Sequence, residues 1–327
     1  MTIEKIVESF SSIQALIIGD VMLDSYIWGA VERISPEAPV PIINVKRKDF
    51  RLGGAANVAL NILSLGAKPV LCSLIGDDEE GKKLLQRMTE SGMSKEGIVV
   101  TSGRPTTVKT RVIASHQHVV RVDEESDREV NADEEKALME RITKLLPQCQ
   151  VVVFEDYDKG VINASVIERT VALAAKHKIP TVVDPKRRNF LAYKNVTLFK
   201  PNLKELREGL KIDVAAANQT QVEQATALLK DKLQAKGVMV TLSEHGVYID
   251  FEDQKIKLQA HEREIADVSG AGDTVVSVAA LCTALALAPK TIAFLSNLAG
   301  GLVCQHVGVV PIDKDELIKE ASKDFSA

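Results

Sequence analysis

Residues 267–274, DVSGAGDT, stand directly before the apolar run VVSVAALCTALALA and predict the start of a buried helix. Gly270 and Gly272 leave the backbone free to approach a ligand, and the first turn of a helix directs unpaired N–H groups and a positive dipole end outward. The pattern predicts a phosphate-binding turn. Asp273 would lie beside that phosphate, where a carboxylate can take the proton from an attacking hydroxyl. An acid that only favours the helix dipole, after a tight glycine turn, explains the same residues.

The composition is that of a globular protein. Its 327 residues, 45% of them hydrophobic, suffice for one large α/β domain or two smaller ones. The formal net charge of -4 gives no overall electrostatic reason to bind nucleic acid or an anionic membrane. The N-terminal sequence does not resemble a secretory signal, so we expect a cytoplasmic location. Reduced and mostly buried thiols are expected at the four cysteines, Cys72, Cys149, Cys282 and Cys304.

Short β-branched runs alternate with amphipathic stretches along the chain. ALIIG is followed by GGAANVALNILSLG, and PVLCSLIG is followed by EEGKKLLQRMTESG. This alternation predicts a mostly parallel sheet that is covered by helices on both faces. Thr220 and Glu223 predict a capping box for a helix that runs through Leu233. The apolar C-terminal stretch is interrupted at Pro289-Lys290, which predicts two buried helices rather than a membrane span.

Two stretches, about 25–48 and 99–125, do not fit the alternation. Both have strand-like patterns without a helix between the strands. Paired with each other, they would form a small β lid that covers one edge of the main domain. We therefore expect a single domain over residues 1–327 with these two lid segments.

Several motifs together resemble the ribokinase-like, or pfkB, family of carbohydrate kinases. The family signature D-[TS]-x-G-A-G-D is closely approached by Asp267 to Asp273, with Val268 in place of the usual threonine. A second signature is matched by GGAANVA, and the stretches GDVMLD, FKPNLKE and VTLSEHG follow the family's order. The more common phosphate-binding motifs GxxxxGK[ST] and GxGxxG in a dinucleotide-binding context do not occur. The resemblance covers essentially the full length and implies the ribokinase-like fold, α/β with a doubly covered, mostly parallel sheet and a small β lid.

The resemblance also implies roles for particular residues. Asp273 would be the catalytic base, and the surrounding backbone amides would stabilise the charge of the transferred phosphoryl group. ATP would be the co-substrate, and Glu205 would reach Mg²⁺ through water. The amides are those of Gly270, Ala271, Gly272 and Asp273. The sugar would contact Asp20, Asp24, Gly53, Gly54 and Asn57. The nucleotide would contact Asn202, Leu203, Lys204, Glu205, Thr241, Ser243, Gly246 and Asn297.

Each of these positions also has a purely structural explanation. Asp24 could cap a turn, the glycine pair could permit close helix packing, and Asn57 could be a satisfied buried amide. Asn202 could be an N-cap followed by an acid that the helix dipole favours. At Ser243 the family more often has glycine, and Asn297 is explained almost equally well by helix packing.

A narrower resemblance concerns the substrate. ERISPEAPVP, RLGGAANVA, EDYDKG and VDPK are similar to segments of the kinases that phosphorylate D-glycero-D-manno-heptose 7-phosphate at C1, on the route to ADP-heptose and lipopolysaccharide. Those kinases are often fused to an adenylyltransferase, and we expect this chain to correspond to the kinase half. A phosphorylated sugar needs local cations. The candidates are Arg33, Arg111, Arg121, Lys186 and Arg188. Alternatives are a kinase for another sugar or sugar phosphate, or a noncatalytic sugar-phosphate sensor; a homodimer through the lid strands is expected.

Overall fold

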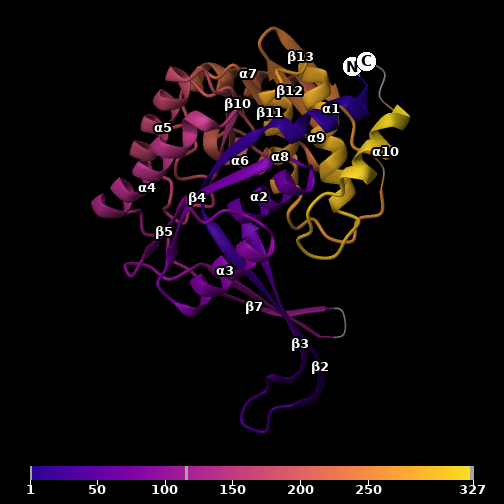
Figure 1. The fold of residues 1–327 in the computed structure, drawn as a ribbon. Coiled ribbons are helices and arrows are strands. Elements are labelled where there is room, and N and C mark those ends of the chain that lie inside the picture. Colours follow the sequence, from indigo (N-terminus) through magenta and orange to yellow (C-terminus); the bar gives the residue numbers. More distant parts are fainter. Residues whose placement is uncertain (1, 115–116, 262, 325–327) are drawn as a thin grey trace.

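A computed structural model describes residues 2–114, 117–261 and 263–324, and its main feature is a nine-stranded sheet (Figure 1). In spatial order across the described sheet, each pair of neighbouring strands between the edge strand β5 and β11 is parallel. At the other edge, β12 is antiparallel to both β11 and β13. The predicted mostly parallel sheet is therefore confirmed. In spatial order the strands are β13 (Gln254–Leu258), β12 (Val247–Phe251), β11 (Gly237–Thr241), β10 (Leu198–Phe199), β9 (Thr181–Asp184), β8 (Val151–Glu155), β1 (Gln14–Gly19), β4 (Lys68–Gly76) and β5 (Ile98–Thr101).

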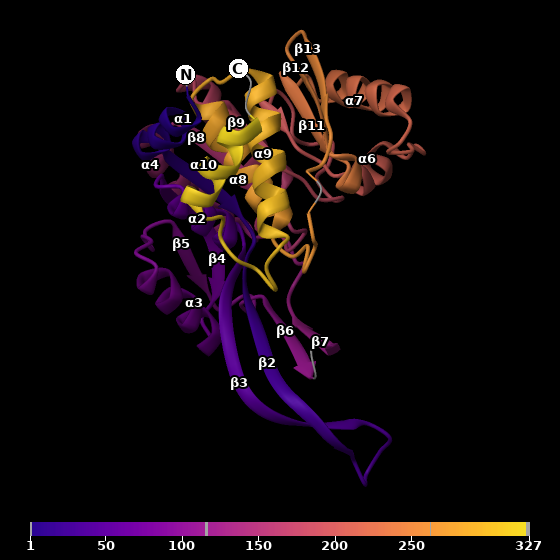
Figure 2. The ribbon, with the colours of Figure 1, turned by 90° about the vertical axis from the view of Figure 1, so that its right-hand side faces the viewer.

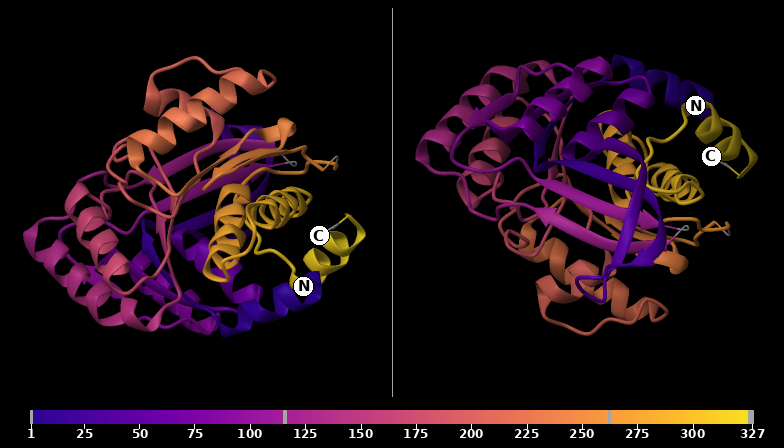
Figure 3. Two further views of the ribbon diagram at one scale, coloured as in Figure 1. Left: turned by 90° about the horizontal axis from the view of Figure 1, so that it is seen from above. Right: turned by 90° about the horizontal axis from the view of Figure 1, so that it is seen from below.

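Helices cover both faces of the sheet, as Figure 3 shows from above and below. Alternate residues of the central strand β1 serve the two faces: Ile17 belongs to one core, and Leu16 and Ile18 belong to the other. Both faces are buried, which explains the near-continuous apolar strands. One core contains residues of α1 (Ile3–Ser9), α2 (Ala55–Ser64), α3 (Glu79–Glu90), α8 (Ala271–Ala284), α9 (Pro289–Val303) and α10 (Lys314–Asp324). The other contains residues of α4 (Ala132–Leu145), α5 (Ala164–Lys176), α6 (Leu203–Leu210) and α7 (Gln219–Leu233).

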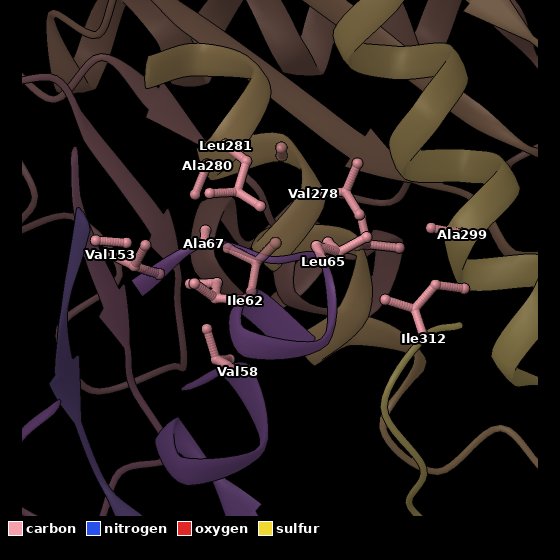
Figure 4. Close-up of a cluster of buried hydrophobic side chains, with 14 of the residues drawn as sticks. Val58, Ile62, Leu65, Ala67, Val153, Val278, Ala280, Leu281, Ala299 and Ile312 are labelled. Atoms are coloured by element: carbon pink, nitrogen blue, oxygen red, sulfur yellow. The ribbon is translucent and has the colours of Figure 1, made fainter. Parts of the chain in front are cut away.

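Helices α2 and α8 pack directly against each other. Val58 and Ile62 of α2 and Val278 and Leu281 of α8 lie in one fully buried apolar cluster (Figure 4). The hydroxyl oxygen of Ser277 also lies 3.3 Å from the backbone oxygen of Val58. This packing brings the N-terminal turns of the two helices, and hence the two glycine-rich segments of the sequence, to the same edge of the sheet.

A second sheet of four strands extends away from the main body (Figures 1 and 2). Its order is β3 (Pro41–Gly54), β2 (Val21–Ile34), β6 (Val108–Ala114) and β7 (Gln117–Glu124). The bounds differ from the expected lid segments. Strand β5 pairs parallel with β4 in the main sheet, so the start of the segment 99–125 does not belong to the second sheet, and its residues 115 and 116 lie outside the described part. The first segment is longer than expected, because β2 begins directly after β1 and β3 continues to α2.

The start of α7 differs from the sequence prediction. Its N-cap is Asn218, whose side chain accepts from the backbone N–H of Gln221 at 3.2 Å, so the predicted capping box of Thr220 and Glu223 is wrong. Thr220 lies in the first turn of the helix instead. Asparagine is as good an N-cap as serine and better than threonine, which explains the choice.

The apolar C-terminal stretch forms the two helices α8 and α9, as predicted, and the break between them is at Pro289. Among the described residues, no helix combines the length and the apolar composition that a membrane span requires. The four cysteines are free; three are buried and Cys304 is half-buried.

We expect Gly54→Ala to destabilise the protein by at least about 3 kcal/mol in urea unfolding. Gly54 has φ 57° and ψ -134°, and an added Cβ would lie 2.4 Å from the backbone oxygen of Asp20. The strained backbone costs about 1–3 kcal/mol and the clash adds to it. Gly92→Ala is the matched control, because Gly92 also has a positive φ but has no atom within 4 Å of the added Cβ. Equal losses for the two variants would show that the clash contributes nothing.

Candidate active site

The site lies at the C-terminal edge of the parallel strands, where ligands bind in open α/β sheets. Charged residues follow or end four neighbouring strands: Asp20 after β1, Glu155 at the end of β8, Asp184 at the end of β9 and Lys200 after β10. All four are buried. The edge is therefore strongly polar although the strands that lead to it are apolar.

Helix α8 begins at this edge in the way that the sequence predicts. Its N-cap is Gly270, with φ 81°, and no side chain caps the helix. The backbone N–H of Ala271 donates to the oxygen of Val268 at 3.3 Å, so this amide is already engaged in a turn. Within the described residues, the N–H groups of Gly270, Gly272 and Asp273 have no hydrogen-bond acceptor. Three of the four predicted amides are thus bare donors at the positive end of the helix dipole.

Asp273 is held by two side chains from other parts of the fold. One carboxylate oxygen accepts from Asn57 Nδ2 at 2.7 Å, and the other accepts from the hydroxyl of Tyr157 at 2.8 Å. The carboxyl is 4% exposed, and burial raises its pKa to about 6, although both hydrogen bonds act in the opposite direction. At neutral pH Asp273 is therefore a carboxylate with a raised basicity, in a fixed position beside the start of α8.

Asp24 and the glycine pair form a second part of the site at the root of the second sheet. Asp24 is buried and forms an ion pair with Arg111 of the neighbouring strand β6. The Asp24 carboxylate occupies the space where a side chain at position 53 would lie. A Cβ on Gly53 would be 2.3 Å from Asp24 Oδ2. The predicted sugar-binding residues Asp24, Gly53 and Asn57 are thus brought together with Arg111.

Asp20 is a buried acid that holds the backbone of another loop. Its carboxylate accepts three backbone N–H bonds, from Tyr157 at 2.8 Å, Lys159 at 3.1 Å and Val161 at 3.1 Å. Burial raises its pKa, while these bonds lower it. The residue is 1% exposed, comparable with Asp24 at 3%, and its contact with the sugar stays a prediction. In this structure Asp20 fixes the loop that carries Tyr157 to the site.

Two lysines and three acids meet beside α8. Lys200 forms an ion pair with Asp184 at 2.9 Å, and Lys186 forms one with Glu205 at 2.6 Å. Lys186 also lies 4.9 Å from the centre of the Tyr157 ring. Burial alone would lower the pKa of Lys186, but Asp184 and Glu205 outweigh it and raise the pKa above its usual range. The sequence predicts that Lys186 binds the sugar phosphate, and this stays a prediction; within the protein its ion pair is with Glu205.

Glu155 is a buried acid of this cluster that lacks a compensating partner among the side chains that the structure describes. Within the described residues, neither of its carboxylate oxygens has a hydrogen-bond partner. Burial, together with the nearby Asp184 and Asp273, raises its pKa well above the usual value. No three acidic, histidine or cysteine side chains of the described part lie close enough to enclose a metal ion. The residues thus fit a cation that keeps most of its water ligands, as Mg²⁺ commonly does beside phosphates.

The predicted nucleotide-binding residues fall into two groups. Asn202 and Glu205 form a capping box at the start of α6, and Asn202 bridges to Thr241 at the end of β11. Leu203 is half-buried, and the Lys204 side chain is 81% exposed. Ser243 has φ 53° and Gly246 has φ 82° in the turn after β11. A positive φ at Ser243 explains why glycine is favoured there. Asn297 donates to the backbone oxygen of Gln259 at 2.8 Å, so its amide is engaged within the protein.

The remaining basic candidates lie at the periphery. The Arg121 side chain is 57% exposed and pairs with Asp123 on the same strand. Arg188 pairs with Asp127, and Arg33 is exposed near the distal end of β2. Of the basic side chains proposed from the sequence, only Arg111 and Lys186 are joined to the acids of the site.

Four residues of the site had no role in the sequence prediction: Tyr157, Glu155, Asp184 and Lys200. All four stand in the stretches EDYDKG, VDPK and FKPNLKE, at the ends of strands. Polar residues directly after a buried strand were the available signal, because such positions meet at one edge of a parallel sheet.

Comparison with known proteins agrees with this geometry. A family model described as pfkB family carbohydrate kinase matches residues 13–315. The bifunctional protein HldE of Desulfatibacillum aliphaticivorans is 38% identical over 312 residues, which cover 95% of this chain and 63% of that protein. The bifunctional protein HldE of Campylobacter curvus is 39% identical over 296 residues, which cover 90% and 62%. The chain spans less than two thirds of the length of these relatives.

Similar solved structures share the fold at low sequence identity. Phosphofructokinase-2 from Escherichia coli in complex with potassium has a TM-score of 0.77 and 19% identity, covering 95% of this chain and 98% of that chain. Arabidopsis thaliana ribokinase complexed with ribose and ATP has a TM-score of 0.73 and 17% identity, covering 96% and 99%. The family match, which extends over most of the chain, and the ribokinase-like topology lead to one conclusion: this chain belongs to the pfkB family of carbohydrate kinases and is a sugar kinase.

Proposed function

We propose that this kinase transfers the γ-phosphoryl group of ATP to the C1 hydroxyl of D-glycero-D-manno-heptose 7-phosphate, giving heptose 1,7-bisphosphate on the route to ADP-heptose. The relatives named HldE and the similar segments of sequence support this substrate. Three of those segments, RLGGAANVA, EDYDKG and VDPK, surround the candidate site, and the fourth forms the far end of the β2–β3 hairpin. Segments that distinguish a substrate are expected where the substrate binds.

The observation that carries the proposed chemistry is the position of Asp273. Its carboxylate, held by Asn57 and Tyr157, lies in the first turn of α8, next to the bare N–H groups of that turn. The carboxylate takes the proton of the acceptor hydroxyl, while the amides of Gly272 and Asp273 donate to the phosphoryl oxygens. The acceptor oxygen then displaces ADP in line.

Asp24 and Arg111 suit opposite ends of a phosphorylated sugar. A carboxylate accepts hydrogen bonds from two hydroxyls, and a guanidinium donates to a phosphate with its planar fork. The two side chains are already paired, and both are less than one-fifth exposed. In this proposal Asp24, Gly53, Gly54 and Asn57 contact the sugar, and Arg111 contacts its phosphate, with Arg121 as a more distant cation.

Magnesium is the proposed metal, and Glu205 is the residue that reaches its water shell. When bound, Mg²⁺ neutralises the charge of the β- and γ-phosphates. Asn202 positions Glu205, because the capping box fixes the Glu205 side chain at the start of α6. Thr241, Gly246 and the turn around Ser243 lie on the same side of the sheet edge and would contact the nucleotide.

The second sheet has an apolar face that suits a homodimer. Ile27, Val112 and Val120 lie opposite one another across β2, β6 and β7, and Val120 and Val122 are each 49% exposed. Exposed β-branched residues on a projecting sheet favour pairing with a second copy. The same sheet would cover the sugar and exclude water, which otherwise competes as acceptor.

We expect phosphorus NMR to show a new C1 phosphate when the protein is incubated with heptose 7-phosphate, ATP and Mg²⁺. Ribose, fructose, fructose 6-phosphate and unphosphorylated heptose are tested side by side, with ADP release as the second readout. A strong preference for an unphosphorylated sugar would reject the substrate assignment. ADP release that does not depend on which sugar is added, or no ADP release at all, would favour a sensor.

Asp273→Asn is expected to reduce phosphoryl transfer by at least about 100-fold while the protein stays folded, because the base is removed. In the wild type, the pKa of about 6 means that the carboxylate is present above that pH and is lost as the pH falls through it. The value of kcat/KM should therefore fall on the acid side of about pH 6. Asp315→Asn, at an exposed position of α10, is the control. Near-normal turnover of Asp273→Asn would rule out its role as the base.

Light scattering should give the mass of a dimer for the wild type and of a monomer for Val120→Lys. The introduced charge would have to be buried in the proposed interface, which costs several kcal/mol. Val100→Lys is the matched control, because Val100 is equally exposed, at 50%, but lies on β5 of the main sheet. A dimer of unchanged stability in Val120→Lys would contradict this interface.

A further inference from the structure

The most informative unassigned group in the site is the ammonium of Lys186, which follows β9. It lies between two parts of the site that have different tasks. On one side Nζ is 2.6 Å from Glu205 Oε1, and Glu205 is the acid proposed to reach magnesium. On the other side it lies 4.9 Å from the ring centre of Tyr157, whose hydroxyl donates to Asp273. The phosphoryl group that is transferred from ATP to the acceptor has to pass between Glu205, the acid proposed to reach magnesium, and Asp273, the proposed base.

The two lysines of the cluster differ in what they can reach. Lys200 has a side chain that is 3% exposed, and it is paired with Asp184, next to Gly272 of the first turn of α8. Lys200 therefore stabilises the buried side of the site. The Lys186 side chain is 30% exposed, and its partner Glu205 also serves the capping box of α6. Lys186 is the cation that can contact a ligand while it remains tethered to the protein.

The charge of the cluster calls for such a contact. Glu155, Asp184, Asp273 and Glu205 are acids, and in the described part of the chain Lys186 and Lys200 are the cations of the cluster that oppose them. A γ-phosphoryl group carries negative charge, so these acids repel it unless cations and bare amides outweigh them. Both lysines are paired with an acid, but only the Lys186 side chain is appreciably exposed, at 30% against 3% for Lys200. The ammonium accessible to the incoming charge is therefore that of Lys186.

The order of the strands separates Lys186 from the sugar phosphate. Lys186 follows β9, which lies on the β10 side of the central strands, next to the strand that leads to Asn202 and Glu205. Asp24 and Arg111 belong to the second sheet, whose strand β2 follows β1. Lys186 therefore stands on the nucleotide side of Asp273, and Arg111 stands on the sugar side.

We propose that Lys186 is a catalytic residue that binds the transferring γ-phosphoryl group of ATP, rather than a ligand of the sugar phosphate. The inference rests on the proposed function only in requiring transfer of a phosphoryl group, whatever the sugar. In the step, the acceptor oxygen forms the new P–O bond, the bond to the β-phosphate oxygen breaks, and its electron pair leaves with ADP. The proton of the acceptor goes to Asp273. Lys186 stays protonated throughout and contacts the phosphoryl oxygens, whose charge its ammonium offsets.

The test compares Lys186→Met with Lys230→Met, which is closely matched. Lys230 forms an ion pair of the same length, 2.6 Å, with the buried Asp250, and its side chain is 22% exposed, but it lies on α7 away from the site. We expect Lys186→Met to lower kcat by at least about 100-fold, the range for the loss of one donor to a developing charge. The KM for the sugar should change by less than about threefold. Lys230→Met should lose stability without losing kcat.

A binding measurement makes the assignment independent of the sugar. By calorimetry, the wild type should bind Mg·ADP more tightly when aluminium fluoride is added, because the fluoride complex imitates the phosphoryl group in transit. Lys186→Met should lose this gain and keep the affinity for Mg·ADP. Lys186→Gln and Lys186→Arg repeat the measurement if the methionine variant does not fold, and arginine should retain part of the gain, since it keeps the charge.

Two results would overturn the assignment. One is a variant that keeps kcat but has a KM for the phosphorylated sugar raised more than tenfold, since that would make Lys186 a ligand of the sugar phosphate. The other is an unchanged gain from aluminium fluoride in the variants, or no such gain in the wild type. If the gain is present in the wild type and lost in the variants while heptose 7-phosphate is not an acceptor, only the substrate proposal fails.

Discussion

The hydrogen bond between Asn57 and Asp273 joins two parts of the chain that are 216 residues apart in sequence. It exists because α2 and α8 pack against each other on the same face of the sheet, with Val58 and Val278 in one core. The glycines before each helix then meet at the strand ends. Gly53 leaves space for the Asp24 carboxylate, and Gly270 turns the chain so that α8 begins with uncapped amides. The helix packing therefore sets the distance between the sugar side of the site and the base.

Burial of charge is the second constraint, because the site contains more acids than the cations next to it can neutralise. Burial raises the pKa of Asp273 to about 6 and that of Glu155 well above its usual value. Such an edge disfavours a triphosphate until compensating charge arrives. The helix dipole of α8, the two lysines and a divalent cation are the available sources. Under the proposed roles, the ion pair of Lys186 with Glu205 gives each side chain a partner until the nucleotide and its metal bind.

Most of the fold could be predicted from the sequence, because the alternation of apolar strands and amphipathic helices carries the information. The start of α8 and the carboxylate at Asp273 could also be predicted, since glycines and an acid before an apolar helix have few explanations. The backbone hydrogen bonds of Asp20 could not, because a carboxylate that follows a strand can bind a sugar or a backbone loop with the same sequence pattern. Lys186 was recognised as a cation for a phosphate, but strand order decides which phosphate, and local sequence does not reveal that order. The cap of α7 was missed because Asn218 and Thr220 are both good N-caps.

The second sheet is part of the site rather than a separate cover, and this limits how it can move. Strand β2 follows directly on Asp20, and the Asp20 backbone oxygen accepts from Ala55 at the start of α2 at 3.0 Å. Arg51 of β3 donates to the backbone oxygen of Val309 at 3.0 Å, and Glu125, just after β7, pairs with Lys159 at 2.7 Å. The root of the sheet is thus fixed on both sides. The pairing of β2 with β3 is irregular only farther out, at Trp28 and Gly29 and again at Val31 and Arg33. Closure over a bound sugar would bend the strands at these irregularities, so Asp24, Gly53 and Asn57 remain in place while the distal sheet moves.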